Sequence, residues 1–98
     1  MYQITVITAR QNTDTVFWPQ SENIRAIIQE CRTSGSLVND ELSISEDRLT
    51  RTYTTTWITK EKYLEFIDNE VVSEERWNRK MYNNKNNIVM STTEAKEI

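Results

Sequence analysis

Hydrophobic and polar residues alternate along the first segment of the chain, from Tyr2 to Ala9. Tyr2, Ile4 and Val6 fall on one side of an extended backbone, and Ile7 and Ala9 fall on the other. β-Branched residues dominate the segment, and these side chains pack well on a pleated surface. The pattern therefore predicts a β-strand with apolar residues on both of its faces.

The next apolar pattern has the period of a helix. Ser21 is a good N-cap, and Glu22 in the first turn complements the helix dipole. Gly35 can adopt the left-handed conformation that ends many helices. Between these signals apolar residues recur at i, i+3, i+4 and i+7, which indicates one buried stripe. The stripe consists of Ile24, Ile27, Ile28 and Cys31. The pattern predicts a helix from Glu22 to Thr33.

Two further alternating segments, Val38 to Ser45 and Leu49 to Trp57, flank a polar turn and predict a β-hairpin. The second strand of this hairpin has two unlike faces. One face carries the threonines at positions 50, 52, 54 and 56, and the other carries Arg51, Tyr53 and Trp57. Threonine suits an exposed strand face. We therefore expect the aromatic face to be covered by helices.

A second helical region begins after Trp57. Thr59 is its N-cap, and Ile58 can pack on Tyr63 as a hydrophobic staple. A further cap signal at Ser73 predicts that the helix breaks near Val72-Ser73 and then resumes. The predicted buried stripe is Tyr63, Leu64, Ile67 and Val71, with Trp77 and Met81 on the continuation. An asparagine-rich connector then leads to a last strand from Ile88 to Thr92.

The predicted order of elements is β-α-β-β-α-β. Two right-handed crossovers around a central hairpin give a ferredoxin-like α+β fold, in which a four-stranded antiparallel sheet carries two helices on one face. The chain of 98 residues suits one domain, which we assign to residues 1–92, followed by a flexible tail at residues 93–98. The open sheet face carries apolar residues, so we expect it to bind a second copy of the chain and form a dimeric α+β barrel.

Composition excludes several functions. The chain has no histidine, which rules out Cys/His zinc sites and imidazole catalysis, and its one cysteine cannot form an internal disulfide. We expect no metal and no cofactor. No apolar run reaches the ~20 residues needed to span a membrane, and the first residues do not resemble a signal peptide. These patterns predict a cytoplasmic protein without a membrane partner. The many asparagines and threonines in a small chain are typical of a viral accessory protein.

A nucleic-acid partner is disfavoured by the net charge of −3. Arg51-x-Tyr53 resembles the opening of an RNA-binding RNP1 motif. Threonines nevertheless stand at positions 52 and 54, where the motif has glycines, and at position 55, where it has an aromatic residue. The basic residues Arg76, Arg79, Lys80 and Lys85 are predicted to form a solvated face, with Glu75 and Arg79 paired at i, i+4.

The segment Trp57-Ile58-Thr59-Lys60-Glu61-Lys62-Tyr63-Leu64 resembles the third-strand-to-helix junction of the antibiotic-biosynthesis-monooxygenase-like dimeric α+β barrels. The resemblance implies a homodimer joined through its sheets and a pocket between sheet and helices. Haem-degrading members use Asn, Trp and His around that pocket. Trp57 matches the tryptophan, but this chain has no histidine and its first strand has no asparagine. Haem chemistry is therefore disfavoured, while cofactor-independent oxygenases act on electron-rich aromatic substrates.

Five large or charged residues are candidates for a ligand pocket that takes a small aromatic molecule: Arg51, Tyr53, Trp57, Trp77 and Trp18. The competing interpretation makes the aromatic residues core or dimer packing, which a small sheet–helix domain needs. Arg51 either binds a carboxylate or stacks on a ring, or else it pairs with Asp40 or Glu41 across the hairpin. Cys31 is predicted to be a small buried hydrophobe rather than a nucleophile.

Two functions remain open. The first is a non-enzymatic protein that acts as a homodimer or adaptor through its sheet face, which the apolar second face and the absence of a recognisable catalytic set favour. The alternative is a cofactor-independent monooxygenase-like enzyme or small-molecule binder with Tyr53 and Trp57 in its pocket wall. No converging set of catalytic residues identifies an enzyme, so the sequence leans toward the first.

Overall fold

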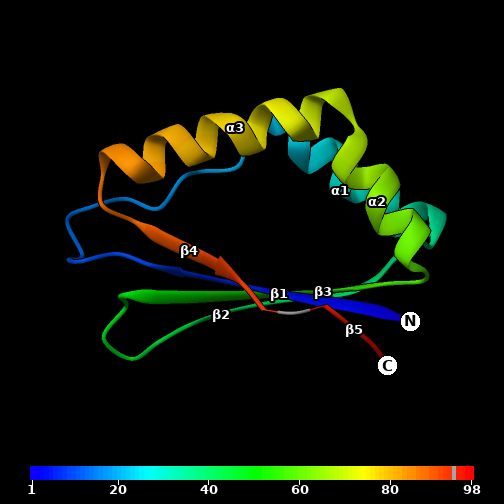
Figure 1. Ribbon diagram of the computed structural model, residues 1–98, viewed down its shortest axis with the longest axis horizontal. Helices are drawn as coiled ribbons and strands as arrows, with labels where there is room; N and C mark the ends of the chain where they lie inside the picture. The colour runs from blue at the N-terminus through cyan, green and yellow to red at the C-terminus, as the bar shows by residue number, and fades with distance from the viewer. Residues whose placement is uncertain (94) are drawn as a thin grey trace.

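The computed structural model describes residues 1–93 and 95–98. In chain order they form β1 (Tyr2–Ala9), α1 (Glu22–Ser34), β2 (Leu37–Ile44), β3 (Thr50–Trp57), α2 (Lys60–Asp68), α3 (Glu70–Lys85), β4 (Val89–Thr92) and β5 (Lys96–Glu97). The three labelled helices lie over one face of the sheet and leave the other face uncovered (Figure 1).

The sheet confirms the predicted ferredoxin-like topology. Its strands are ordered β2-β3-β1-β4, and each neighbouring pair is antiparallel. The short strand β5 pairs with Tyr2 and Gln3 of β1 and so extends the edge that β4 begins. This strand lies in the segment for which the sequence predicts a loose tail. The strand forms through main-chain pairing with β1, which the pattern of side chains does not predict.

The second helical region breaks at Asn69, not near Val72-Ser73 as the sequence predicts. The backbone of Asn69 is extended, and its Oδ1 accepts hydrogen bonds from the amides of Val71 and Val72 at 2.9 and 3.4 Å. Asparagine is a strong N-cap because its short side chain reaches these unpaired amides. Asn69 therefore begins α3, and Ser73 lies inside the helix.

The position of this break changes which residues are buried. Leu64 and Val71, predicted to be buried, are 43% and 39% exposed. Tyr63 packs against the core as predicted. Phe66 of α2 also packs there, and Val72 of α3 is fully buried. The predicted stripe assumes one continuous helical phase up to Val72, whereas the break at Asn69 restarts that phase.

The hydrophobic core lies under the junction of the helices, at the end of the sheet where β2 begins and β3 ends. Its buried members come from α1, β2, β3 and α3: Ile24, Ile28, Leu37, Trp57 and Val72. The N-cap of α1 is Ser21 and its last residue is followed by Gly35 in the left-handed conformation at φ 83°, as predicted. These caps fix the length of α1 over the sheet.

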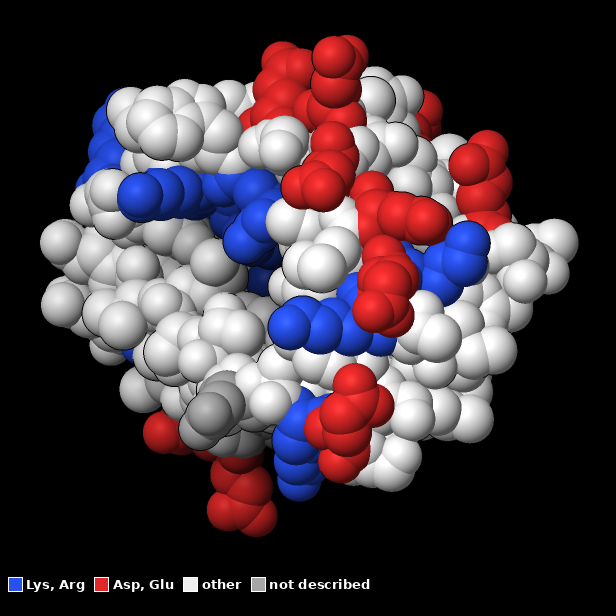
Figure 2. All heavy atoms as spheres, turned by 45° about the vertical axis from the view of Figure 1, so that its right-hand side comes forward, with Lys and Arg blue, Asp and Glu red and all other residues white. Residues whose placement is uncertain are grey.

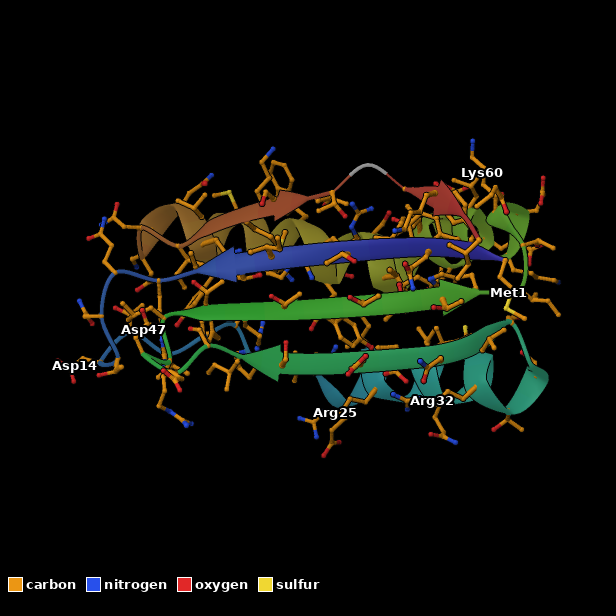
Figure 3. The ribbon with its side chains drawn as sticks, turned by 90° about the horizontal axis from the view of Figure 1, so that it is seen from below. Met1, Asp14, Arg25, Arg32, Asp47 and Lys60 are labelled. Carbon is orange, nitrogen blue, oxygen red and sulfur yellow. The ribbon has the colours of Figure 1, made fainter. Side chains whose placement is uncertain are left out.

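The uncovered face of the sheet is lined mainly by threonine. Thr5 and Thr54 are hydrogen-bonded across β1 and β3 at 3.1 Å, and Gln3 donates to Thr56 at 3.4 Å. Figure 3 views the molecule from this side, with the sheet in front of the helices. Alternation along β1 and pairing with β4 place a smaller apolar group on the same face: Ile7, Ala9 and Val89.

Within the described residues, no helix combines the length and apolarity needed to cross a bilayer. The same part of the chain contains no cluster of three or more Cys, Asp or Glu side chains arranged to hold a metal ion.

Candidate functional site

Trp57 lies in the core. Its side chain is 2% exposed, and its ring contacts Tyr63 and Phe66 at centroid distances of 5.7 and 5.0 Å. Its Nε1 donates to the hydroxyl of Thr55 at 2.9 Å, so the polar group of the indole is also satisfied. Packing accounts for every part of this side chain.

Tyr53 belongs to a hydrogen-bonded group that joins β3, β2 and α1. Its hydroxyl donates to Asp40 Oδ2 at 2.8 Å, and Arg32 contacts both oxygens of Asp40 at 3.2 and 2.5 Å. The hydrogen bond from Arg32 lowers the pKa of Asp40. Burial, followed by the hydrogen bond to Asp40, raises the pKa of Tyr53 well above its usual value. The Tyr53 hydroxyl therefore stays protonated as a hydrogen-bond donor to Asp40 and is a weak acid.

Arg51 does not pair with Asp40 or Glu41. Its guanidinium lies 4.7 Å from the centre of the Phe17 ring, and that of Arg10 lies 4.4 Å from the same ring. Arg10 is held by backbone carbonyls, since it donates to Arg48 O at 3.0 and 2.7 Å and to Thr15 O at 2.8 Å. Arg51 makes no ion pair with any described residue. Burial and the charge of Arg10 lower its pKa.

Trp18 helps to attach the β1–α1 connection to α3. Its ring contacts Tyr82 at a centroid distance of 5.3 Å, and its Nε1 donates to Glu75 Oε2 at 3.2 Å. The same carboxylate oxygen accepts from the amide of Ser21 at 3.0 Å. Glu75 therefore joins α3 to the start of α1, and it does not form the predicted ion pair with Arg79.

Trp77 lies on the outer side of α3 and is 60% exposed. Lys80 Nζ lies 6.0 Å from the centre of its ring. The structure thus brings Arg51 and Tyr53 onto one face of β3 at neighbouring positions, and it places Trp57, Trp18 and Trp77 in three other environments. That these five residues bind a ligand stays a prediction.

The inner face of α3 contains residues that the sequence pattern did not single out. Val72 is buried, and Arg79 and Asn83 follow it at i+7 and i+11 on the same side of the helix. Arg79 is half-buried, although the sequence predicts it on a solvated face. Their helical spacing from Val72 identifies these positions. That spacing can be used only when α3 is known to begin after the break at Asn69.

Two polar atoms on this inner face are buried and unpaired. Among residues 1–93 and 95–98, neither Arg79 Nε nor Asn83 Oδ1 has a hydrogen-bond partner. Burial lowers the pKa of Arg79, and the nearby charges of Arg76 and Arg51 lower it further. Basic side chains recede into a hollow beneath the helical layer in Figure 2, while acidic ones gather along the top and right of that face.

A small cavity opens beside Asn83. It has a volume of about 240 Å³ and is lined by Lys80, Asn83, Asn84, Ile88 and Met90. A second, open hollow of about 430 Å³ follows α1 and is lined by Gln20, Arg25, Ala26, Ile28, Gln29 and Arg32. Arg25 and Arg32 are labelled along this helix in Figure 3.

The sheet supplies a floor for the first cavity. Thr8 of β1 pairs with Arg51 on one side and with Met90 on the other, so these three side chains share the helix-facing side of the sheet. Neighbouring strands are about 4.8 Å apart, which places Arg51 and Met90 about 10 Å apart across one row. Thr8 and Arg51 therefore lie in the same row of the sheet as Met90, which lines the cavity.

Cys31 packs against the core at the end of the α1 stripe and is half-buried. Burial and the nearby Glu30 raise the pKa of its thiol. A raised pKa lowers the fraction of reactive thiolate, so this environment disfavours nucleophilic chemistry at Cys31.

No known protein-family profile matches the chain, and no curated protein matches it. Among solved structures, the chain is similar to a protein from Deinococcus radiodurans that is provisionally described as an antibiotic biosynthesis monooxygenase. The TM-score is 0.60 at 10% identity, with 100% of this chain and 92% of the other covered. This likeness confirms the predicted resemblance to that superfamily at the level of the fold. At this identity no residue role transfers.

Proposed function

We propose that the protein acts as a non-enzymatic homodimer whose two sheets pack through their uncovered faces. The observation that carries the proposal is the composition of that face, where β-branched threonines in register surround Ile7, Ala9 and Val89. Such side chains form an even surface on a pleated sheet. A second copy related by a two-fold axis presents the same surface and is complementary to it.

Two polar pairs of this face are satisfied within the sheet. The hydroxyls of Thr5 and Thr54 bond to each other, and Gln3 bonds to Thr56, so these groups do not all depend on water. Sheets that pack face to face lie about 10 Å apart and interdigitate their side chains. A stable dimer of this kind buries on the order of 1,200–2,000 Å² in total.

Sedimentation velocity at micromolar protein concentration tests this proposal. The expected result is a dimer for the wild-type chain and a monomer for Thr52→Lys, because Thr52 lies opposite Ile7 at the centre of the face. Leu64→Lys is the matched control, since Leu64 is 43% exposed on α2 and lies on the opposite side of the sheet. A wild-type monomer would exclude the proposal.

A second candidate function is the binding of a small molecule between α3 and the sheet, with or without chemistry on it. The half-buried Arg51 and Arg79, which have no carboxylate in ion-pair contact within the described chain, favour this candidate. The fold likeness to a protein described as a monooxygenase is compatible with it. Saturable quenching of tryptophan fluorescence by aromatic carboxylates, reporting through Trp18 beside Tyr82, would test it.

A further inference from the structure

We propose that Arg79, Asn83 and Arg51 form a binding site for a small organic carboxylate that also carries a hydrogen-bond donor. The inference deepens the second candidate above and rests on it, but it does not require the homodimer. It assigns a chemical class to the ligand and a role to each of the three side chains.

The polarity of α3 is reversed beyond Val72. A helix that covers a sheet normally turns apolar residues inward and charged ones outward. After Val72, α3 does the opposite: Arg79 and Asn83 face the sheet, while Trp77 and Met81 are 60% and 55% exposed. Core packing does not account for an arginine and an asparagine beneath a helix with apolar residues available on its outer side.

The two unpaired atoms on α3 differ in their hydrogen-bonding role. Arg79 Nε is a donor and Asn83 Oδ1 is an acceptor, and neither has a partner in the described part of the chain. The two residues are four apart, which puts their Cβ atoms about 5–6 Å apart on one side of the helix. A ligand that bonds to both must accept at one end and donate at the other.

Positive charge gathers between α3 and the sheet. Arg79 of α3 and Arg51 of β3 are both half-buried, and the charge of Arg51 is one of those that lower the pKa of Arg79. Glu75 offsets part of this charge, but its Oε2 is held by Trp18 and Ser21. Two guanidinium groups without a carboxylate in contact are complementary to an anion, and the planar fork of arginine matches a carboxylate.

The size of the cavity limits the size of the ligand. The cavity beside Asn83 is about 240 Å³, below the ~300–1,000 Å³ typical of pockets for drug-sized ligands. Ile88 and Met90 give it an apolar part, and Lys80 adds a positive charge to its lining. The site therefore suits a compact molecule with one charged end.

Isothermal titration of the full chain with 4-hydroxybenzoate tests the proposal, because this probe carries a carboxylate and a hydroxyl. 4-Hydroxybenzamide is its neutral counterpart, benzoate lacks the hydroxyl, and inorganic phosphate is an anion of a different class. We expect 4-hydroxybenzoate to bind, benzoate to bind more weakly, and the amide not to bind. Equal binding of the amide, or binding of phosphate alone, would overturn the carboxylate assignment.

Variants locate the site. Arg79→Met should weaken 4-hydroxybenzoate binding roughly tenfold or more, the loss expected for a charge-assisted hydrogen bond. Arg76→Met, an exposed arginine one turn earlier, is the matched control. Asn83→Leu should reduce the affinity for 4-hydroxybenzoate to that for benzoate and leave benzoate unchanged. Wild-type affinity in Arg79→Met would exclude the site. If that variant does not fold, Arg79→Lys is the alternative. It keeps the positive charge but lacks the planar guanidinium, so it should bind 4-hydroxybenzoate several-fold more weakly than the wild type.

The two proposals fail separately. Sedimentation velocity measures whether the chain forms a dimer, and isothermal titration measures ligand binding at the carboxylate site. A monomer that binds 4-hydroxybenzoate through Arg79 retains this inference, and a dimer that binds none of the probes removes it.

Discussion

Arg79 and Asn83 lie one turn apart on the inner face of α3, and each buries a polar atom that no described residue satisfies. Nearly all buried polar groups in folded proteins are hydrogen-bonded, and a buried charge without a partner is more costly than a neutral group. The interface between α3 and the sheet is therefore less stable at this point than apolar side chains would make it.

Replacing Arg79 with methionine should stabilise the protein. Methionine has a similar length, keeps an apolar stem at this half-buried position, and removes the guanidinium charge, since the pKa of Arg79 is lowered mainly by burial. We expect the free energy of unfolding to rise by ~1 kcal/mol or more, as found when buried charges give way to apolar residues. Urea titration measures this change. Arg76→Met should change it little, and a clear loss of stability in Arg79→Met would indicate a structural role instead.

Truncating Trp57 should destabilise the fold severely. Trp57 is 2% exposed and packs on Tyr63 and Phe66. Trp57→Ala leaves a large cavity and should cost ~3–5 kcal/mol of unfolding free energy. The matched control is Trp77→Ala, because Trp77 is 60% exposed and its loss should stay within ~0.5 kcal/mol. Similar effects for the two variants would contradict the assignment of Trp57 to the core.

Trp57 shows what the sequence could predict, whereas Trp77, expected on the continuation of the buried stripe, is exposed. Alternation along residues 50–57 places Trp57 on the covered face, and the structure agrees. The order of elements likewise follows from local periodicity and caps such as Ser21 and Gly35, because each signal is contained in a few neighbouring residues. The fold class was therefore readable from the chain alone.

The residues of the candidate site could not be predicted from local sequence patterns. Asn69 and Ser73 are both acceptable caps, and only tertiary contacts decide which of them begins α3. That choice sets the helical phase and turns Arg79 inward. Glu75 also shows that local spacing does not reveal tertiary contacts. Its spacing predicts an ion pair with Arg79, but its carboxylate accepts hydrogen bonds from Trp18 and Ser21, which are distant in sequence.

Stability at acid pH should depend on Asp40. The pKa of Asp40 is lowered in the folded protein, chiefly by the hydrogen bond from Arg32, and Tyr53 also donates to it. A lowered folded pKa adds stability above the unfolded pKa of about 3.9, and this stability is lost as the pH falls through the folded pKa. In Asp40→Asn this contribution is absent. The difference in melting temperature between the wild type and Asp40→Asn should therefore shrink as the pH falls below about 4. A constant difference from pH 6 to pH 2 would disprove the linkage.

Glu75 should stabilise the connection between β1 and α1. Its Oε2 accepts from Trp18 Nε1 at 3.2 Å and from the amide of Ser21 at 3.0 Å, so one side chain on α3 holds two points of this connection. Glu75→Ala leaves both donors unpaired and should lower the free energy of unfolding by ~1–3 kcal/mol. It should also speed proteolysis between Arg10 and Arg25, since local opening of this segment becomes easier. The neighbouring Glu74 is exposed and makes neither contact. Glu74→Ala should therefore leave both the unfolding curve and the cleavage rate unchanged. Equal cleavage rates in the two variants would show that the connection is held by Trp18 and Tyr82 alone.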